Sequence, residues 1–250
     1  MPVTVQPVPI LSDNYAWLLR DEATGRCAAV DPADADAVIR AVDAQEAHRG
    51  GGLDLILLTH HHDDHVAGTD EVRRRYGCPV VGAAADARRL PALDRAVAEG
   101  DTVALGESRA RVLDTPGHTR GHIAFAFEGG GGTPPVLVCG DTLFSLGCGR
   151  LLEGTAAEMF ASLRKLAALP PDALVCCGHE YTRSNARFAL HADPANAALR
   201  ARAAEVDRLR AEGKPTVPSR LGDELAENPF LRAPDVPTLA RLRSEKDSFR

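Results

Sequence analysis

One internal stretch constrains this chain more than any other: a short apolar run that ends in a cluster of histidines and aspartates. The run extends from Leu55 to Leu58, and after Thr59 the sequence reads His-His-His-Asp-Asp-His. An apolar run of this length is typical of a strand covered on both faces. Four imidazoles and two carboxylates at its end would repel one another or be costly to desolvate, unless a divalent cation binds them. A histidine tag would lie at a terminus, so this internal cluster predicts a metal site.

The composition is that of a globular protein and limits the kinds of partner. The chain has 250 residues, 26% charged and 44% hydrophobic, which suits one large domain or a core with a small appendage. A net charge of -6 argues against a nucleic-acid-binding surface. There is no apolar stretch of membrane-spanning length and no signal pattern at the start. We therefore expect a cytoplasmic monomer without nucleic-acid or membrane partners.

The six cysteines do not form a disulfide pattern. Cys176 and Cys177 are adjacent, while Cys27, Cys139 and Cys176 lie inside apolar runs that we interpret as strands. No two cysteines form a Cys-x-x-Cys pair, which would indicate a structural zinc site or a redox motif. We expect buried free thiols in a reducing compartment.

Strand and helix patterns alternate through most of the chain, and the last quarter is helical. The predicted strands are Val3 to Val8, Tyr15 to Leu19, Cys27 to Val30, Leu55 to Leu58, Pro79 to Gly82, Val103 to Leu105, Arg109 to Leu113, Ile123 to Phe127, Val136 to Val138 and Leu174 to Cys177. The predicted helices are Asp36 to His48, Thr69 to Tyr76, Thr155 to Leu169, Thr182 to His191 and Pro194 to Ala211. Residues 83 to 100 read as helix or irregular structure between two β-rich halves, which is compatible with a duplicated pair of sheets. We expect no strand after Gly178.

Four of the predicted strands end in residues that commonly bind metals. The candidate ligands at these ends are His60, His62, Asp64, His65, His118, Asp141 and His179. In layered α/β proteins, ligand sites assemble at the carboxyl ends of strands. Seven ligands exceed the need of one tetrahedral ion, so we expect a two-metal site. Asp141 is the single carboxylate that arrives alone at a strand end, and it is our candidate for the ligand that bridges both ions.

These motifs resemble those of the metallo-β-lactamase superfamily, whose His-x-His-x-Asp-His signature is carried here by His60, His62, Asp64 and His65. Along nearly its full length the chain is similar to the glyoxalase II (hydroxyacylglutathione hydrolase) family. The matching segments are Thr59 to His65, Thr115 to Ile123, Gly140 to Phe144, Gly147 to Thr155, Cys177 to Thr182, Asn228 to Arg232 and Leu242 to Asp247. The first segment is shared by the whole superfamily, whereas the later ones together are much more specific.

The resemblance implies an α/β protein in which residues 1–179 form an αβ/βα sandwich, the metallo-β-lactamase fold. Residues 180–250 would form a small helical domain that completes the substrate site. By the family pattern, His60, His62 and His118 hold one metal, Asp64, His65 and His179 hold the other, and Asp141 bridges them. Asp64 and Asp141 would then be the catalytic carboxylates. The cofactors would be two divalent ions, for which we expect zinc, although iron and manganese suit the same ligands.

The implied reaction is hydrolysis of S-D-lactoylglutathione to D-lactate and glutathione by a metal-bridged hydroxide, with this small glutathione thioester as the partner. A thioester is a reactive acyl donor whose thiolate leaves readily, so no protein nucleophile is needed. The family pattern assigns glutathione binding to Arg150, Tyr181, Arg243 and Lys246. At two positions the chain departs from that pattern. Arg150 replaces a lysine, and Leu152 replaces a tyrosine that contacts glutathione.

Five residues near the predicted ligands have other expected roles. His61 lies between two ligands and should point away from them, and Asp63 should also lie outside the ligand set. His122 is expected to support the site or belong to the core. Asp31 ends a strand, where it could orient a ligand histidine. Glu180 is a weaker candidate for the same role.

Three other functions share parts of this pattern. Another hydrolase on the same core, such as a broad thioesterase or a lactonase, needs the metal ligands but not Arg243 and Lys246 near Tyr181. A mononuclear iron persulfide dioxygenase would make little use of Asp64, His65 and His179 as a second site. A non-catalytic binding module would not need every ligand position to be filled. Metal content per chain distinguishes these alternatives.

Overall fold

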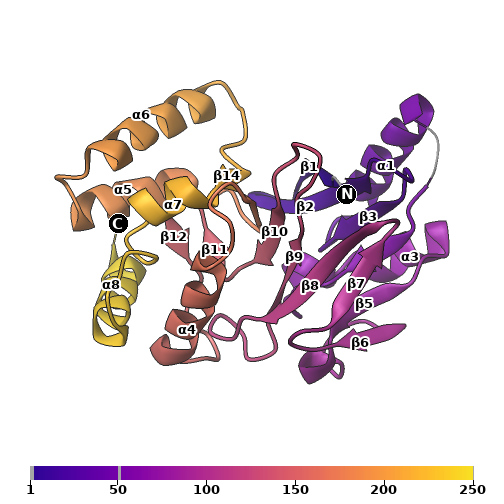
Figure 1. Ribbon diagram of the computed structural model, residues 1–250, viewed down its shortest axis with the longest axis horizontal. Helices are drawn as coiled ribbons and strands as arrows, with labels where there is room; N and C mark the ends of the chain where they lie inside the picture. The colour runs from indigo at the N-terminus through magenta and orange to yellow at the C-terminus, as the bar shows by residue number, and fades with distance from the viewer. Residues whose placement is uncertain (1–2, 50–51, 250) are drawn as a thin grey trace.

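Two six-stranded sheets carry the fold (Figure 1). The computed structural model describes residues 3–49 and 52–249. The first sheet follows chain order and contains β1 (Val3–Ile10), β2 (Asn14–Asp21), β3 (Cys27–Val30), β4 (Leu55–Leu57), β5 (Val80–Ala83) and β6 (Arg95–Val97). Strands β1 to β3 are antiparallel, and β3 to β6 are parallel. The carboxyl ends of β3, β4 and β5 therefore lie at one edge of the sheet.

The second sheet has the strand order β14-β13-β10-β9-β8-β7. Its members are β7 (Thr102–Leu105), β8 (Ser108–Asp114), β9 (Ile123–Phe127), β10 (Val136–Gly140), β13 (Leu174–Cys177) and β14 (Ser219–Arg220). Only β10 and β13 are parallel, so the residues that follow these two strands emerge side by side. A separate hairpin consists of β11 (Leu143–Phe144) and β12 (Gly147–Cys148).

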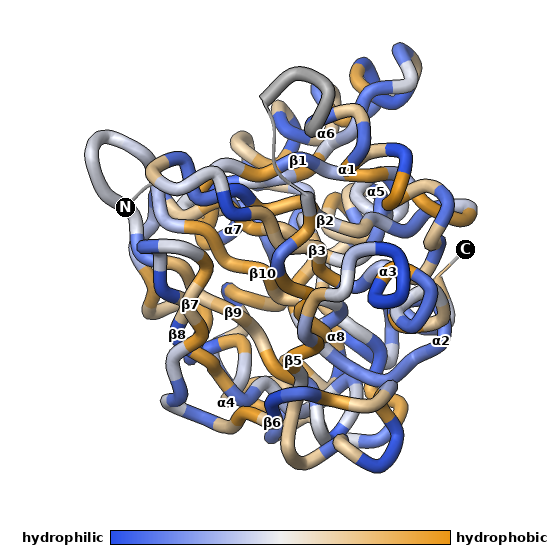
Figure 2. The backbone as a smooth tube through the Cα atoms, turned by 90° about the vertical axis from the view of Figure 1, so that its right-hand side faces the viewer, coloured by the Kyte–Doolittle hydropathy of each residue, from blue (hydrophilic) through white to orange (hydrophobic). Residues whose placement is uncertain are grey.

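Helices lie outside the sheets. They are α1 (Ala35–Arg49), α2 (Asp63–Val66), α3 (Thr69–Tyr76), α4 (Ala156–Ala167), α5 (Thr182–Ala192), α6 (Ala197–Ala211), α7 (Leu221–Glu227) and α8 (Val236–Ser248), with a 3₁₀ turn, η1, at Ala84–Asp86. Figure 1 shows α1 and α3 towards one end of the molecule and α4 to α8 towards the other. In Figure 2 the hydrophobic residues follow central strands such as β9 and β10, whereas α3 is largely hydrophilic. This is the expected α/β sandwich of two sheets with helices outside.

Helix α4 illustrates how the local sequence sets an element. The Thr155 side chain accepts a hydrogen bond from the backbone of Glu158, and the Glu158 side chain accepts one from the backbone of Thr155. This capping box fixes the first turn. Met159, Leu163 and Leu166 then recur on one face and are fully buried in the core. The predicted helix therefore forms with the predicted face inward.

Two sequence predictions about elements are wrong. Residues 83 to 100 contain the strand β6 and the turn η1, so this segment completes the first sheet instead of separating two halves as helix or irregular structure. The chain after Gly178 also contains a strand, because β14 pairs with Leu174 and Val175 of β13. Both strands are very short, with three and two residues.

The apolar core runs through both proposed domains. One cluster of buried side chains contains residues of the sheets together with Val217, Phe230 and Leu239 of the C-terminal part. The boundary between residues 179 and 180 stays a prediction, since the core does not divide there. All six cysteines are buried and free, as expected of the thiols themselves. In the described part of the chain, no helix has the length and apolar character needed to cross a bilayer.

Candidate metal centre

The two sheets meet where the predicted strand ends lie. The backbone amide of Tyr15 at the start of β2 donates to the carbonyl of Gly178, just after β13. The amide of Ile123 in β9 donates to the carbonyl of Thr59, just after β4. These contacts bring the loops after β4, β8, β10 and β13 into one cluster. The four segments that carry the seven candidate ligands therefore converge.

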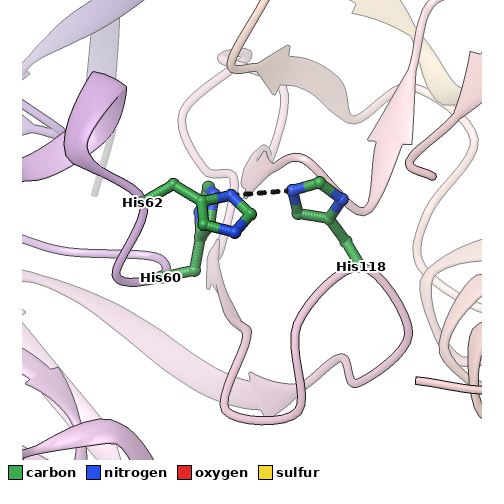
Figure 3. A group of neighbouring side chains, drawn as sticks. All are labelled: His60, His62 and His118. Atoms are coloured by element: carbon green, nitrogen blue, oxygen red, sulfur yellow. Dashed lines mark hydrogen bonds between the residues drawn. The ribbon is translucent and has the colours of Figure 1, made fainter. Parts of the chain in front are cut away.

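Three histidines form the first group. His60 and His62 follow β4, while His118 lies on the loop after β8, and Figure 3 shows the three rings gathered from these two segments. Nδ1 of His62 lies 3.1 Å from Nε2 of His60 and 3.1 Å from Nε2 of His118. Two nitrogens bound tetrahedrally at 2.0–2.1 Å from zinc would lie roughly 3.3 Å apart. The three nitrogens are thus spaced as the ligands of one cation.

A second group contains one carboxylate and two imidazoles. Asp64 and His65 lie within α2, and His179 follows β13 after one glycine. Nε2 of His65 lies 3.3 Å from Nε2 of His179, which is 3.5 Å from Oδ2 of Asp64. The candidate ligand atoms of each group lie within 4.8 Å of one another. This second group also has the size of a cation site.

Asp141 lies between the two groups. Its Oδ2 is 3.3 Å from Nε2 of His179 and 3.5 Å from Nε2 of His118, while its Oδ1 is 3.4 Å from Nε2 of His65. Oδ1 is buried and has no hydrogen-bond partner among the described residues. A buried carboxylate oxygen without a partner is costly. A pair of cations on either side of Asp141 would satisfy it, so the residues present fit the metals that the sequence predicts.

The pKa values of the central groups reflect this crowding. Burial alone would raise the pKa of Asp141, yet His65 and His179 lower it well below its usual range. Burial alone would lower the pKa of His65, yet Asp141 and Asp31 raise it well above its usual range. The geometry thus favours positive charge beside Asp141. A divalent cation supplies that charge and leaves His65 neutral, which is the form that binds metals.

Three of the candidate ligand histidines are oriented through their outer nitrogens. Nδ1 of His65 donates to Asp31 at 3.1 Å, and Nδ1 of His179 donates to Asp13 at 3.1 Å. Nδ1 of His118 donates to the carbonyl of Arg150 at 2.9 Å. Since these acceptors hold the proton on Nδ1, each Nε2 keeps its lone pair for a cation.

Asp31 has the role that its position after a strand predicts. Its carboxylate accepts from His65 and from the hydroxyl and amide of Thr59. The Asp31 carboxylate is also close enough to His60 and His65 to share a cation with them. Its oxygens are already engaged by these hydrogen bonds, however, so we assign Asp31 as an acceptor and not as a metal ligand. Glu180 does not orient a ligand histidine as suggested. Its carboxylate accepts from Tyr15 at 2.9 Å and from the amide of Thr216, which ties the C-terminal part to β2.

Two polar residues of the β1–β2 turn were missed in the sequence. Asp13 orients His179, and Nδ2 of Asn14 donates to Oδ2 of Asp64 at 2.9 Å. Asp13 and Asn14 lie between the predicted strands Val3 to Val8 and Tyr15 to Leu19, and neither is among the predicted site residues. The available signal was that two side chains able to bond a ligand stand at the start of the fully buried strand β2, Asp13 just before it and Asn14 as its first residue.

His61 and His122 behave as predicted. The His61 ring turns towards Asp86, with 2.9 Å between Nδ1 and Oδ2. His122 is buried and stacks on His60, with ring centroids 4.7 Å apart. Its Nε2 accepts a hydrogen bond from the Asp141 amide. Asp63, at the first position of α2, is exposed.

Tyr181 and Leu152 lie exposed close to residues of the centre. The Tyr181 ring stacks on His179 with centroids 4.5 Å apart and packs edge-on against Phe144. Burial, and then the charges of nearby aspartates, raise the pKa of Tyr181, so its hydroxyl stays protonated. Leu152 is 59% exposed and immediately precedes Glu153, whose amide donates to the carbonyl of His118.

The three basic candidates for glutathione binding differ in exposure. The Arg150 side chain is 65% exposed, and its Nε donates to Asp247. Arg243 is only 6% exposed and donates to the same carboxylate and, at 2.7 Å, to the carbonyl of Cys148. Lys246 donates to a serine of α5. Arg243 is therefore buried, whereas Arg150 and Lys246 are accessible to a ligand.

Comparisons with known proteins cover nearly the whole chain. The family model of the metallo-beta-lactamase superfamily matches residues 11–179, and that of the hydroxyacylglutathione hydrolase C-terminus matches residues 180–249. A hydroxyacylglutathione hydrolase from Acidiphilium cryptum is 57% identical over 246 residues, with 98% of this chain and 97% of the relative covered.

Solved structures agree in fold. The crystal structure of ETHE1 from Myxococcus xanthus matches with a TM-score of 0.73 at 24% identity, covering 99% of this chain and 92% of that one. The crystal structure of TTHA1623 in a di-iron-bound form matches with a TM-score of 0.53 at 29% identity, covering 72% and 91%. Together with the sequence relatives, these matches confirm the resemblance found in the motifs. The chain belongs to the metallo-beta-lactamase superfamily and, within it, to the hydroxyacylglutathione hydrolase family.

Proposed function

We propose that this enzyme hydrolyses S-D-lactoylglutathione to D-lactate and glutathione. The observation that carries the proposal is the position of Asp141. Its two carboxylate oxygens, one of which is buried without a hydrogen-bond partner among the described residues, face both groups of ligand atoms. The name of the relative from Acidiphilium cryptum supports the substrate class. The alternative of a non-catalytic module is disfavoured, since every ligand position is filled and oriented.

Two divalent cations are the proposed cofactors. His60, His62 and His118 would hold one, Asp64, His65 and His179 the other, and Asp141 both. Bound cations of this kind supply hydroxide from water at neutral pH and polarise a carbonyl oxygen. Zinc is our first choice, and the di-iron form of TTHA1623 supports iron as the alternative. The second ligand group disfavours a mononuclear dioxygenase.

The protein's own residues prepare the reaction. Asp31 and Asp13 keep the rings of His65 and His179 in place, and Asn14 holds Asp64. Phe144 packs edge-on against the rings of both Tyr181 and His179. The thiolate leaving group needs little help from a proton donor. Asp64 and Asp141 are therefore proposed as catalytic through the charge and position they give to the site.

Four residues are proposed to bind the glutathione part. Arg150, Lys246 and the hydroxyl of Tyr181 are within reach of solvent, and they can donate to carboxylates and carbonyls. Arg243 would add positive charge from below and hold Asp247 in place. These assignments favour a glutathione thioester, because the basic residues can bind the pair of carboxylates of its glutathione part. A lactone or a β-lactam lacks that pair.

The test is a comparison of substrates with metal-loaded protein. We expect release of free thiol from S-D-lactoylglutathione, with kcat/KM about tenfold or more above that for the same acyl group on a small neutral thiol. Equal rates on both would favour a broad thioesterase. Hydrolysis of lactones alone, or oxygen uptake with glutathione persulfide, would overturn the proposal. Elemental analysis should give two metals per chain.

The remaining proposals concern the state of the protein in the cell. We propose a cytoplasmic monomer without membrane or nucleic-acid partners, in keeping with the free cysteines and the net charge of -6. Light scattering after size-exclusion chromatography tests the monomer, for which a mass near 26.6 kDa is expected.

A further inference from the structure

A second cluster of charged side chains lies beside the metal centre. It consists of Asp86 at the end of η1, Arg89 three residues later, and Glu153 on the loop after β12. His61 touches this cluster through Asp86, so the cluster adjoins the loop that carries His60 and His62. Neither the metal centre nor the proposed glutathione site uses these three residues.

Asp86 is a buried acceptor with both oxygens engaged. It is 2% exposed, its Oδ1 accepts from Nε of Arg89 at 2.9 Å, and its Oδ2 faces Nδ1 of His61. Gly121 makes room for it, because a Cβ at that position would lie 2.3 Å from Cγ of Asp86. The close approach places Asp86 directly against the loop that carries His118.

Glu153 ties the same loop from the other side. Its two oxygens accept from Nη1 and Nη2 of Arg89 at 2.5 and 3.2 Å, a bidentate pair. One of them also accepts from the amide of Arg120 at 2.9 Å, and the Glu153 amide donates to the carbonyl of His118 at 3.2 Å. Hydrogen bonds from Arg89 lower the pKa of Glu153 to about 2, so it is charged at neutral pH.

The cluster therefore joins parts of the two sheets. Arg89 lies between β5 and β6 of the first sheet, and His118 lies between β8 and β9 of the second. Glu153, between the β11–β12 hairpin and α4, bonds to both segments. Nδ1 of His118 also donates to the carbonyl of Arg150, three residues before Glu153. The position of His118 thus depends on the 150–153 segment, and that segment is held by Arg89.

We propose that Arg89 and Glu153 form a clasp between the sheets that positions His118 for its metal and Arg150 for the substrate. This inference rests on the proposed metal site. Arg89 and Glu153 are positioning residues, since they touch neither the candidate ligand atoms of the metals nor the proposed glutathione contacts. Losing the clasp should weaken the site of His60, His62 and His118, while the site of Asp64, His65 and His179 keeps its own supports, Asp31 and Asp13.

The solvent exposure of the Arg89–Glu153 pair argues against a role limited to stabilising the whole fold. The side chains of Arg89 and Glu153 are 41% and 26% exposed. Ion pairs this open to water contribute little to the free energy of unfolding. Glu153→Gln leaves the contact of Arg89 with the buried Asp86 in place, so it should act on local geometry with a small effect on the melting temperature. Arg89→Met also removes a partner of Asp86, so its melting temperature should fall further.

The test compares Arg89→Met with Arg88→Met. Arg88 is an exposed neighbour for which the described part of the chain shows no hydrogen bond or ion pair, so it is a matched control. We would titrate the metal-free proteins with Zn²⁺ against a chelating indicator. In Arg89→Met we expect one of the two affinities to fall about 10- to 100-fold, as for other residues that orient metal ligands, and the other to stay within about twofold. Arg88→Met should bind both ions as the wild type does.

Two further variants test whether the loss of the ion pair itself causes the change in metal affinity. Glu153→Gln keeps the size of the side chain and should reproduce the selective loss, and Arg89→Lys should give an intermediate loss because lysine cannot form the bidentate pair. Unchanged affinities in Arg89→Met, or an equal loss at both sites with a large fall in melting temperature, would overturn the clasp. The titration needs no substrate, so it remains decisive even if the thioester is not hydrolysed.

Discussion

At the scale of single residues, Asp141 has the greatest consequence. Its oxygens lie 3.3 to 3.5 Å from ligand nitrogens of both groups. We expect Asp141→Ala to lose both metals and to lower kcat by roughly 10³-fold, the upper range for removal of one electrostatic element. Asp63→Ala, two residues from the ligand His65 but exposed, is the control and should be near normal. Elemental analysis and thiol release measure both effects, and near-normal metal content in Asp141→Ala would exclude a bridging role.

A second residue-scale prediction concerns Leu152, which stands where the family pattern has a tyrosine. Its side chain is 59% exposed and offers no hydrogen-bond donor. We expect Leu152→Tyr to lower KM for S-D-lactoylglutathione by about 2- to 10-fold, the worth of one net hydrogen bond. The kcat should change little, and a small neutral thioester should show no gain. If KM fell equally for both substrates, the lower KM would come from the added tyrosine ring in general and not from a contact with glutathione.

The candidate ligands could be predicted because each follows a recognisable apolar run, so residue type and position carried the signal. The supports Asp13 and Asn14 could not, because their contacts span large separations in sequence. Asp13 and His179 are 166 positions apart, and Asn14 and Asp64 are 50 apart. Such pairs form only when the β1–β2 turn meets the end of β13. Asp31 was predictable, since it directly follows a strand that lies beside β4.

At the scale of elements, α7 carries a pH-dependent contribution to stability. Burial, and then the charges of Glu224 and Asp223, raise the pKa of Glu227 from 4.5 to about 7. Because the folded value is the higher one, this stability is fully present below pH 4.5 and is lost as pH rises through about 7. Glutamine mimics the protonated form. We therefore expect Glu227→Gln to match the wild type at about pH 4.5 and to be the more stable protein at about pH 8, measured by chemical denaturation. Parallel pH profiles would contradict the shift.

The elements that escaped prediction are those whose own sequence is too short to specify them. In β6, Arg95 and Ala96 are exposed and only Val97 is buried, so no alternation is visible. In β14, two residues extend the second sheet because Leu174 and Val175 of β13 offer a free edge. Long apolar runs such as β10 are fixed by burial and were predictable. Short edge strands are fixed by their partners.

At the scale of the whole molecule, α5, α7 and α8 contribute to the main core, while residues of α5 and α6 form a second, smaller cluster with Leu146. Phe230 and Leu239 join the apolar cluster of the sheets, and Thr216 bonds to Glu180 beside His179. We therefore expect metal-free protein to unfold in a single transition, with equal calorimetric and van't Hoff enthalpies. Fluorescence of Trp17 in β2 and helical circular dichroism should give the same midpoint. Two separated midpoints would show that residues 180–250 fold on their own.

The last prediction concerns how this acidic enzyme holds an anionic substrate. With a net charge of -6 the protein repels anions at long range, so binding depends on short-range contacts from the C-terminal helix α8 and the 150–153 segment. Lys246→Met should raise KM for S-D-lactoylglutathione by roughly tenfold, the effect of losing one charge-assisted hydrogen bond of about 1.5 kcal/mol. Its melting temperature should change little, because among the described residues the Lys246 ammonium hydrogen-bonds only to Ser184 and lies 5.8 to 6.0 Å from the nearest ring centroids, those of Phe188 and Phe249.

Arg243→Met provides the contrast, since Arg243 is buried and holds both Asp247 and the carbonyl of Cys148. We expect it to raise KM and also to lower the free energy of unfolding by about 1–3 kcal/mol, because it leaves the buried carbonyl of Cys148 unsatisfied. Neither variant should change kcat for a small neutral thioester, as the metal ligands lie on other segments. If both variants lost activity on the two substrates equally, α8 would support the catalytic centre itself and glutathione would be bound elsewhere.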